Sequence, residues 1–207
     1  MAKKKDNSTE DRILEAATYV FIEKGLAGAR MQEIADKAEI NKALLHYYFR
    51  SKDKLFEAIF LRLRDKIIPQ VDCFTDETKT IGERLTQFTD GYIGLFIDSP
   101  RLPAFIFSEI NRDPSLLSSF DEVAKMRLKV LQALEVEMEK GNLIKMDAKH
   151  MLVNIISLCA MPFVAYALMN KLLMSGKHPE EYQTFLEERK EVLRDLMLNT
   201  LCLKNEN

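Results

Sequence analysis

The 207-residue chain contains no tryptophan, only 3 cysteines, 7 glycines and 6 prolines, and no large excess of charge of either sign. Its cysteines, Cys73, Cys159 and Cys202, are odd in number and far apart, so neither a disulfide framework nor a metal site is indicated. A reducing cytoplasm is therefore the expected location. The net charge of −2 excludes a protein that coats nucleic acid or anionic membrane by bulk charge.

Two segments raise the question of export or membrane insertion. Lys3, Lys4 and Lys5 resemble the start of a signal peptide, but polar residues 6–11 follow where an apolar stretch would be required. Residues 152–169 form a long apolar run that Pro162 interrupts. A helix that protein buries on both sides has the same composition, so we expect no membrane partner.

Apolar residues recur at helical spacing, and no sustained apolar and polar alternation is present, so the expected fold class is all-α. Ser8, Asn41 and Ser51 are good N-caps. The N-terminal part is expected to hold helices from residue 8 or 9 to Gly25, over 31–38, over 41–49 and over 51–68. Longer helices are expected at roughly 79–98, 102–112, 116–140, 147–174 and 179–203. We expect a small domain over 1–53 and a larger helical bundle over 54–207.

Residues 31–55 contain two short amphipathic helices joined by a tight turn, the helix-turn-helix arrangement whose second helix lies in the DNA major groove. With Leu45 inward, the outward face holds the small, aromatic and basic residues Ala43, Tyr47 and Arg50, and its flanks hold Lys42, Leu44 and His46. Such side chains can approach base edges and donate to phosphates. A solvated basic face beside ordinary core aromatics would show the same pattern.

Charge is divided unequally along the chain. Residues 1–66 hold 14 basic and 11 acidic residues, whereas the remainder is net acidic. This division fits a small basic DNA-binding domain attached to a larger acidic domain. The three N-terminal lysines are either an arm on adjacent DNA or a solvated tail.

The segments Ile34-Ala35, NKALLHYYF over 41–49 and SKDKL over 51–55 resemble the DNA-binding domain of the TetR (tetracycline-repressor-like) family of bacterial transcription regulators. The resemblance implies a sequence-specific regulator of a double-stranded DNA operator. It further implies a repressor that a small apolar or amphipathic effector releases. The later helices match the family only in length and number.

The same resemblance implies a set of DNA-contacting positions: Arg30, Lys42, Ala43, Leu44, His46, Tyr47, Tyr48 and Lys52. Three positions depart from the family pattern. Glu39 replaces the usual turn glycine, so either the backbone is left-handed there or the turn differs. Arg30 replaces a capping hydroxyl and opposes the helix dipole, although it can reach a phosphate. Leu44 replaces a hydroxyl on the recognition helix, which changes the expected operator.

For the larger domain, the resemblance implies a sensor and a homodimer through the last two helices. The apolar run over 152–169 and the terminal helix support this, because both need a second apolar surface. A ligand pocket is expected among aromatic, sulfur-containing and polar residues: Phe88, Tyr92, Phe96, Phe105, Ser108, Met126, Cys159, Phe163 and Tyr166. Taken singly, each of them fits ordinary core packing better than a pocket. The Pro162 kink either opens room beside Cys159 or accommodates packing.

Other functions have weaker support in the sequence. His46, His150 and His178 are scattered, and neither a G-x-S-x-G motif nor a phosphate-binding loop occurs, so we expect no catalytic residues, no metal and no cofactor. Asp147-x-x-His150 is better explained as a helix start than as half of a di-iron site. An all-α interaction or structural bundle is the alternative to a regulator.

Overall fold

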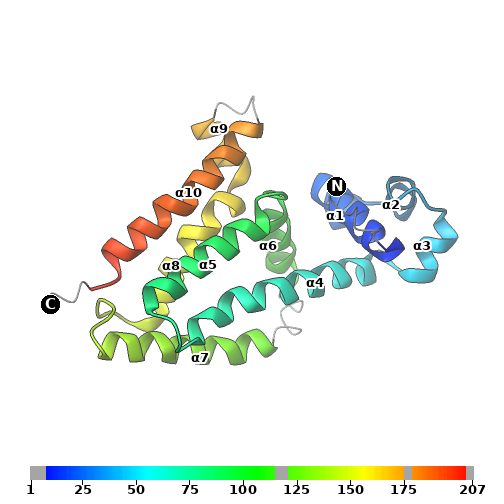
Figure 1. Ribbon diagram of the computed structural model, residues 1–207. Coiled ribbons are helices and arrows are strands. Elements are labelled where there is room, and N and C mark those ends of the chain that lie inside the picture. The colour runs from blue at the N-terminus through cyan, green and yellow to red at the C-terminus, as the bar shows by residue number, and fades with distance from the viewer. Residues whose placement is uncertain (1–7, 115–120, 175–178, 204–207) are drawn as a thin grey trace, which may run out of the picture. The chain divides into compact units, whose positions relative to one another are not determined.

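The computed structural model describes residues 8–114, 121–174 and 179–203 (Figure 1). Within these ranges every named element is helical, and extended pairing is limited to one isolated bridge between Leu143 and Cys202. The all-α prediction is therefore confirmed. The chain divides into two compact units, residues 1–64 and 65–207. The functional boundary expected after residue 53 precedes this division and stays a prediction.

The first unit contains α1 (Thr9–Gly28), α2 (Met31–Lys37), α3 (Lys42–Tyr48) and most of α4 (Lys52–Asp72). Its core side chains are almost wholly inaccessible to solvent: Ile13, Ala17, Phe21, Ile34, Ala35, Leu45, Leu55 and Phe56. The three expected caps are in place, because the side chains of Ser8, Asn41 and Ser51 each accept a backbone N–H three residues later.

Two helix ends in this unit differ from the prediction. Gly25 was expected to end the first helix, but α1 extends to Gly28 across a kink where Gly25 has φ 69°. Glycine adopts this left-handed backbone without a Cβ clash, so the chain bends and resumes its helical turn. The fourth helix was expected to end near Ile68, whereas α4 continues through Pro69 to Asp72.

In its described residues, the second unit holds the end of α4, the short 3-10 helix η1 (Cys73–Thr75) and six further helices: α5 (Ile81–Phe96), α6 (Leu102–Arg112), α7 (Asp121–Glu139), α8 (Ala148–Val164), α9 (Tyr166–Leu173) and α10 (Pro179–Thr200). In this unit α5 packs against η1, α8 and α10, while α8 also packs against α6 and α7 (Figure 1). The aromatic row of α5, formed by Phe88, Tyr92 and Phe96, therefore lies inside the bundle.

Two boundaries of the second unit have clear local causes. Thr80 caps α5 and exchanges hydrogen bonds with Glu83, so the helix begins at Ile81 rather than at residue 79. α10 ends at Thr200 because Leu201 and Leu203 pair their backbone with Ile144 and Asn142. Of the helix expected over 116–140, residues 116–120 lie outside the described residues.

A buried ion pair ties α5 to the end of α7. Arg84 and Glu137 are 3% and 4% exposed, and their charged atoms are 3.5 Å apart. Arg84 also donates to the carbonyls of Phe74 and Lys79, while Glu137 accepts from Asn142 and Lys140. Burial opposes ionisation of Glu137, but these hydrogen bonds outweigh it and lower its pKa. Removing either partner would leave an uncompensated buried charge.

The single helix expected over 147–174 is in fact two helices, α8 and α9, bent by 75°. The break falls at Ala165, three residues after the expected kink at Pro162. Proline cannot donate the helical hydrogen bond to the carbonyl of Leu158, and Arg189 of α10 donates to that oxygen at 3.0 Å. The Cys159 side chain beside this break is fully buried.

A second side chain of α10 completes this junction. The Tyr182 hydroxyl donates to the Pro162 carbonyl over 2.6 Å, and the residue is 0% exposed. Burial raises the pKa of Tyr182 to about 12, so its hydroxyl stays a donor at neutral pH. The broken end of α8 is therefore held by two side chains of α10.

Among the described residues, no single helix has the length and apolar character that a membrane span requires. Only the bent pair of α8 and α9 satisfies both criteria together, and the core face of α8 is packed inside the second unit.

Tyr182→Phe should lower the free energy of unfolding by about 1–3 kcal/mol, because the Pro162 carbonyl would stay buried without this donor. Urea denaturation at one fixed protein concentration measures the change. Tyr19→Phe is the matched control, since Tyr19 is 54% exposed. Equal midpoints for wild type and Tyr182→Phe would contradict a stabilising role for this hydroxyl.

Candidate nucleic-acid interface

α2 and α3 are joined by a tight turn at Glu39. The Glu39 N–H donates to the Asp36 carbonyl at 3.1 Å, and the Ile40 N–H donates to the Ala35 carbonyl at 3.0 Å. These two bonds form a Schellman motif, in which the residue after the C-cap is left-handed and usually glycine. Glu39 adopts this conformation with φ 56°. Of the two alternatives for the turn, the left-handed backbone is therefore the one observed.

α1 supports this turn from the side. Arg12 donates to the Ala38 carbonyl at 2.6 Å, and its guanidinium lies 3.9 Å from the Glu39 carboxylate. A cation at the last carbonyls of a helix is also stabilised by the negative end of the helix dipole. Arg12 therefore fixes the end of α2, the point from which α3 departs.

α3 buries one side and exposes the rest. Leu45 is 0% exposed and the following Phe49 is 9% exposed, so these two anchor the helix. Asn41 caps it by accepting from the Leu44 N–H at 2.8 Å. The predicted contact residues of α3 are exposed, except for the half-buried Leu44: Lys42, Ala43, His46, Tyr47 and Tyr48.

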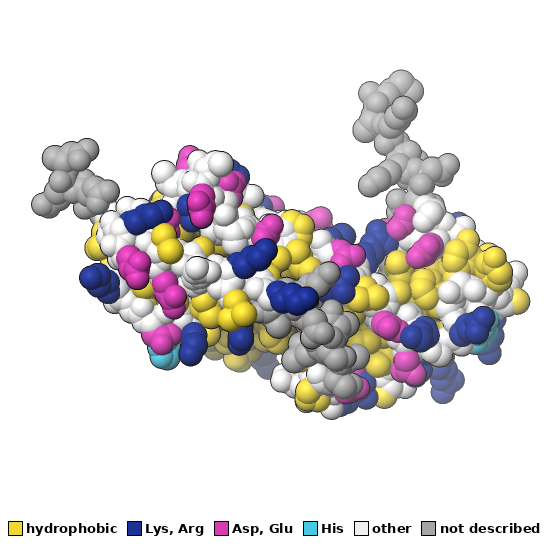
Figure 2. Space-filling view, turned by 90° about the horizontal axis from the view of Figure 1, so that it is seen from below, with side chains coloured by type: hydrophobic (Ala, Val, Ile, Leu, Met, Phe, Trp, Pro, Cys, Tyr) yellow, Lys and Arg dark blue, Asp and Glu magenta, His cyan; other side chains and the backbone are white. Residues whose placement is uncertain are grey.

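The two tyrosines of α3 form the aromatic part of this surface. Tyr47 is 81% exposed, and its ring meets Tyr48 edge to face with centroids 5.6 Å apart. A large aromatic side chain that contributes so little to the core is available for a partner. In Figure 2, the visible face of the first unit carries Lys and Arg side chains close to a His side chain.

The two predicted contacts outside α3 are in different situations. Arg30 precedes α2, is exposed and makes no capping bond with its side chain. Lys52 instead donates to the carbonyls of Leu26 and Ala27 at 2.9 and 3.0 Å. Lys52 thereby connects the first turn of α4 to the end of α1, a role that its sequence position did not suggest. The sequence signal for this contact was Gly25, whose kink turns the last residues of α1 away from its earlier turns.

The residues predicted for a ligand pocket fall into two groups. Six are buried in the second unit: Phe88, Tyr92, Phe96, Phe105, Cys159 and Phe163. The ring centroids of Tyr92 and Phe96 of α5 lie 6.4 and 5.7 Å from the ring centroid of Phe163 of α8. Burial raises the pKa of the Cys159 thiol to about 12, so it is protonated and unreactive at neutral pH.

The other three predicted pocket residues are not among the buried side chains. Ser108 is exposed, because α6 turns its neighbours Ile106 and Glu109 inward. Met126 is half-buried on α7, and Tyr166 packs against Tyr182 with centroids 5.0 Å apart.

Sequence reasoning also missed members of the cluster. Phe74 of η1 packs against Phe88 at 5.1 Å, and the buried Thr89 hydroxyl donates to the Leu85 carbonyl. Nothing in the pattern near Phe74 marked it as a core residue, because η1 is only one turn long.

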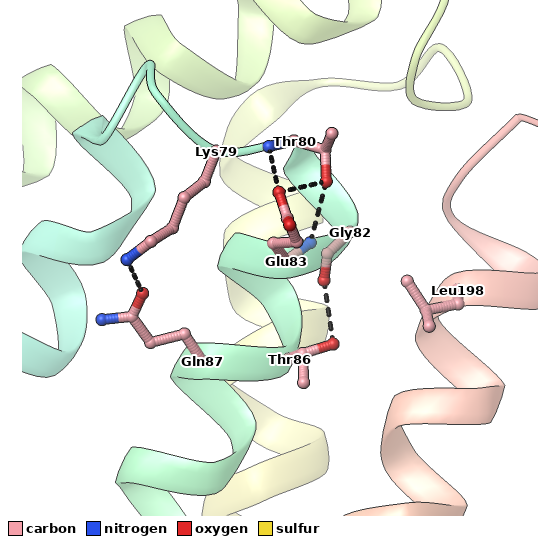
Figure 3. A pocket seen from close by; sticks show the side chains of 7 residues that line it. All are labelled: Lys79, Thr80, Gly82, Glu83, Thr86, Gln87 and Leu198. Atoms are coloured by element: carbon pink, nitrogen blue, oxygen red, sulfur yellow. Dashed lines mark hydrogen bonds between the residues drawn. The ribbon is translucent and has the colours of Figure 1, made fainter.

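A surface hollow of about 580 Å³ lies where α5 begins (Figure 3). Its polar side chains are paired with each other: Lys79 donates to Gln87 at 2.7 Å, and Thr80 and Glu83 form the capping box. The hydrogen bonds from Thr80 lower the pKa of Glu83. None of the predicted pocket residues lines this hollow, whose lining is Lys79, Thr80, Gly82, Glu83, Thr86, Gln87 and Leu198.

Comparison with known proteins agrees with this geometry. The family described as "Bacterial regulatory proteins, tetR family" matches residues 13–59, from α1 into α4. "Probable HTH-type transcriptional regulator YttP" of Bacillus subtilis is 25% identical over 91% of this chain and 94% of its own length. The repressor NicS of Pseudomonas putida is 43% identical over 51 residues, 25% of this chain and 24% of its own.

Solved structures show the same fold over nearly the whole chain. The TetR family transcriptional regulator PfmR from Thermus thermophilus superposes with a TM-score of 0.67 and 18% identity, covering 89% of this chain and 98% of its own. Two short helices joined by a left-handed turn, the second with an exposed basic and aromatic face, define a helix-turn-helix DNA-binding protein. Residues 13–59 thus match the DNA-binding domain of the tetR family of bacterial regulatory proteins, and the chain is a DNA-binding transcriptional regulator similar to members of that family.

Glu39→Gly should raise the free energy of unfolding by about 0.5–1 kcal/mol, because glycine removes the left-handed strain but gains freedom in the unfolded chain. Thermal denaturation measures the change. Glu39→Gln is the control: it keeps the Cβ and the strain while removing the charge. If Glu39→Gln stabilises as much as Glu39→Gly, repulsion at residue 39 rather than backbone strain is the cause.

Proposed function

We propose that this regulator reads its operator with the exposed face of α3 and binds as a homodimer through α8 and α10. The observation that carries the proposal is the division of α3, which anchors itself through Leu45 and leaves Lys42, His46 and Tyr47 outside. Lys42, Ala43, Leu44 and His46 would face base edges in the major groove, because they occupy the first turns of the recognition helix. Tyr47, Tyr48 and Arg30 would face phosphates, whose neutralisation makes affinity depend on salt.

Lys52 has two roles in this proposal. Its ammonium group already satisfies two carbonyls of α1, so it fixes the position of α4 whether or not a phosphate is near. A phosphate would then meet the backbone N–H groups at the start of α4, with Lys52 alongside. Lys52→Ala would mix both effects, which makes Tyr47 the cleaner position for a test.

Regulators of this family bind DNA operators and act as dimers. In this chain the apolar side chains of α8 and α10 are only partly used within the unit. Val153 and Met161 of α8 are 59% and 49% exposed, and Val192 and Leu196 of α10 are 58% and 45% exposed. Since α8 packs against α10, a two-fold partner would cover both helices and form a four-helix interface.

An effector would act through the second unit. The cluster of Phe88, Tyr92, Phe96 and Phe163 is apolar, so a ligand that entered it would be apolar or amphipathic. Such a ligand must part these packed rings, and its preference for the altered state would release the operator and relieve repression. A ligand that occupies the cluster without changing operator affinity would contradict this coupling.

Free Cys73 and Cys159, both buried, support the expected reducing cytoplasm.

Tyr47→Ala should weaken binding to DNA from the region upstream of the protein's own gene by about 1–3 kcal/mol. The ring is mostly exposed, so its loss should leave the fold intact. Fluorescence anisotropy over a series of salt concentrations measures both the affinity and its salt dependence.

Tyr19→Ala is the matched control, an exposed tyrosine on α1 in the same unit. The α3 reading surface would be refuted if Tyr47→Ala bound this DNA as tightly as wild type. Affinity that does not fall with salt would contradict phosphate contacts altogether.

Val192→Glu combined with Leu196→Glu should convert the dimer to a monomer at micromolar concentration, because unpaired carboxylates from both chains would be buried in the interface. Size-exclusion chromatography with light scattering measures the mass. Thr184→Glu, at an exposed position on another side of α10, is the control and should stay dimeric. A monomeric wild type would refute the dimer, and a dimeric double variant would place its interface elsewhere.

A further inference from the structure

α4 belongs to both units of the chain. Residues 52–64 lie in the first unit and residues 65–72 in the second. Pro69 stands inside the helix and cannot donate the helical hydrogen bond to the carbonyl of Asp65, the first residue of the second unit. α4 thus lacks one helical hydrogen bond close to the point where the units divide.

The side chain that follows the proline has an unusually close seat. A Cβ placed on Gly91 of α5 would lie 1.7 Å from Oε1 of Gln70 and 2.6 Å from its Cδ. Any residue other than glycine at position 91 would therefore displace the Gln70 amide. Gly94, one turn further along α5, has no atom within 4 Å of the equivalent position.

α5 is also the helix that carries the aromatic row. Tyr92, the neighbour of Gly91, packs between Phe88 and Phe96 at 5.7 and 5.2 Å. A second contact from η1 reaches the same row, since Phe74 lies against Phe88. The end of α4 and the turn after it are held by α5 at these two places.

The junction between the two contacts is itself bonded. The Cys73 thiol donates to the Gln70 carbonyl at 2.9 Å, and Cys73 is buried. Because burial raises its pKa to about 11, this thiol stays protonated at neutral pH. Gln70 and Phe74 are therefore parts of one short anchored segment.

We propose that Gln70, seated on Gly91, is the positioning residue through which α5 sets the direction of α4 and so adjusts DNA binding. The inference rests on the proposed function and adds the contact by which the sensor unit acts. A shift of α5 around the aromatic row moves the seat of Gln70. The helix that begins at Lys52 in the DNA-reading unit then changes its direction at Pro69.

The experiment compares wild type with Gln70→Ala, Gly91→Ala, the double variant Gln70→Ala/Gly91→Ala, and Gly94→Ala. Gln70→Ala removes the contact, whereas Gly91→Ala fills its seat. Gly94→Ala brings the same gain in helix propensity without touching Gln70. Anisotropy with the upstream DNA gives affinity, light scattering gives the dimer, and thermal denaturation gives stability.

We expect Gln70→Ala and Gly91→Ala each to weaken DNA binding about fivefold or more, the low end of usual coupling between sites. The double variant should be no weaker than either one, because both changes remove one contact. Gly94→Ala should bind like wild type, and all variants should remain dimers.

Unchanged DNA affinity in Gly91→Ala, or additive losses in the double variant, would overturn the role of this contact while leaving the proposed function intact. So would loss of affinity that only follows loss of thermal stability. Failure of the wild type to bind the DNA would overturn both proposals.

Discussion

The C-terminal end of a helix, and a proline inside one, leave backbone carbonyls without a helical partner, and in an all-helical chain of this size the packing depends on how those carbonyls are satisfied. Here side chains from neighbouring helices reach them. The donors and acceptors are Arg12 to Ala38, Lys52 to Leu26 and Ala27, Arg84 to Phe74, Arg189 to Leu158, and Tyr182 to Pro162. All but one of the donors are cationic, which suits the negative end of a helix dipole. Each such bond also joins two elements that hydrophobic contact alone would let slide.

This constraint explains why interrupted helices are tolerated. Gly25 and Pro162 each break a helix, and a long side chain from the next packed helix meets the carbonyls beyond or before the break. In the first unit the result is a fixed angle between α1 and α4. In the second unit the same device holds the end of α8 against α10, so the exposed stripes of the two helices keep one relative arrangement.

Local signals in the sequence were enough to predict much of the helix-turn-helix over residues 31–55. Asn41 and Leu45 specify the cap and the buried side of α3. Glu39 left two alternatives open for the turn, and only the structure shows that its backbone is left-handed. Contacts between distant segments could not be predicted in this way. The intramolecular bonds of Lys52 depend on where α1 bends, and the break at Ala165 depends on Tyr182 and Arg189 of α10. Ser108 was a candidate by polarity, but only the packing of α6 shows that it faces away from the aromatic cluster.

Not every basic residue near α3 is available for contact with DNA phosphates. Of the basic residues near α3, Lys52 is bonded to α1 and Lys54 lies 2.6 Å from Glu57, while Lys42 and Arg50 are exposed. Few cations thus remain for phosphates in each chain, so one reader alone would bind DNA weakly. In the proposed homodimer, two α3 helices about 34–36 Å apart would share the phosphate contacts on successive major grooves. Under that proposal, the spacing of the two α3 helices would matter more for DNA affinity than the contacts of either helix alone.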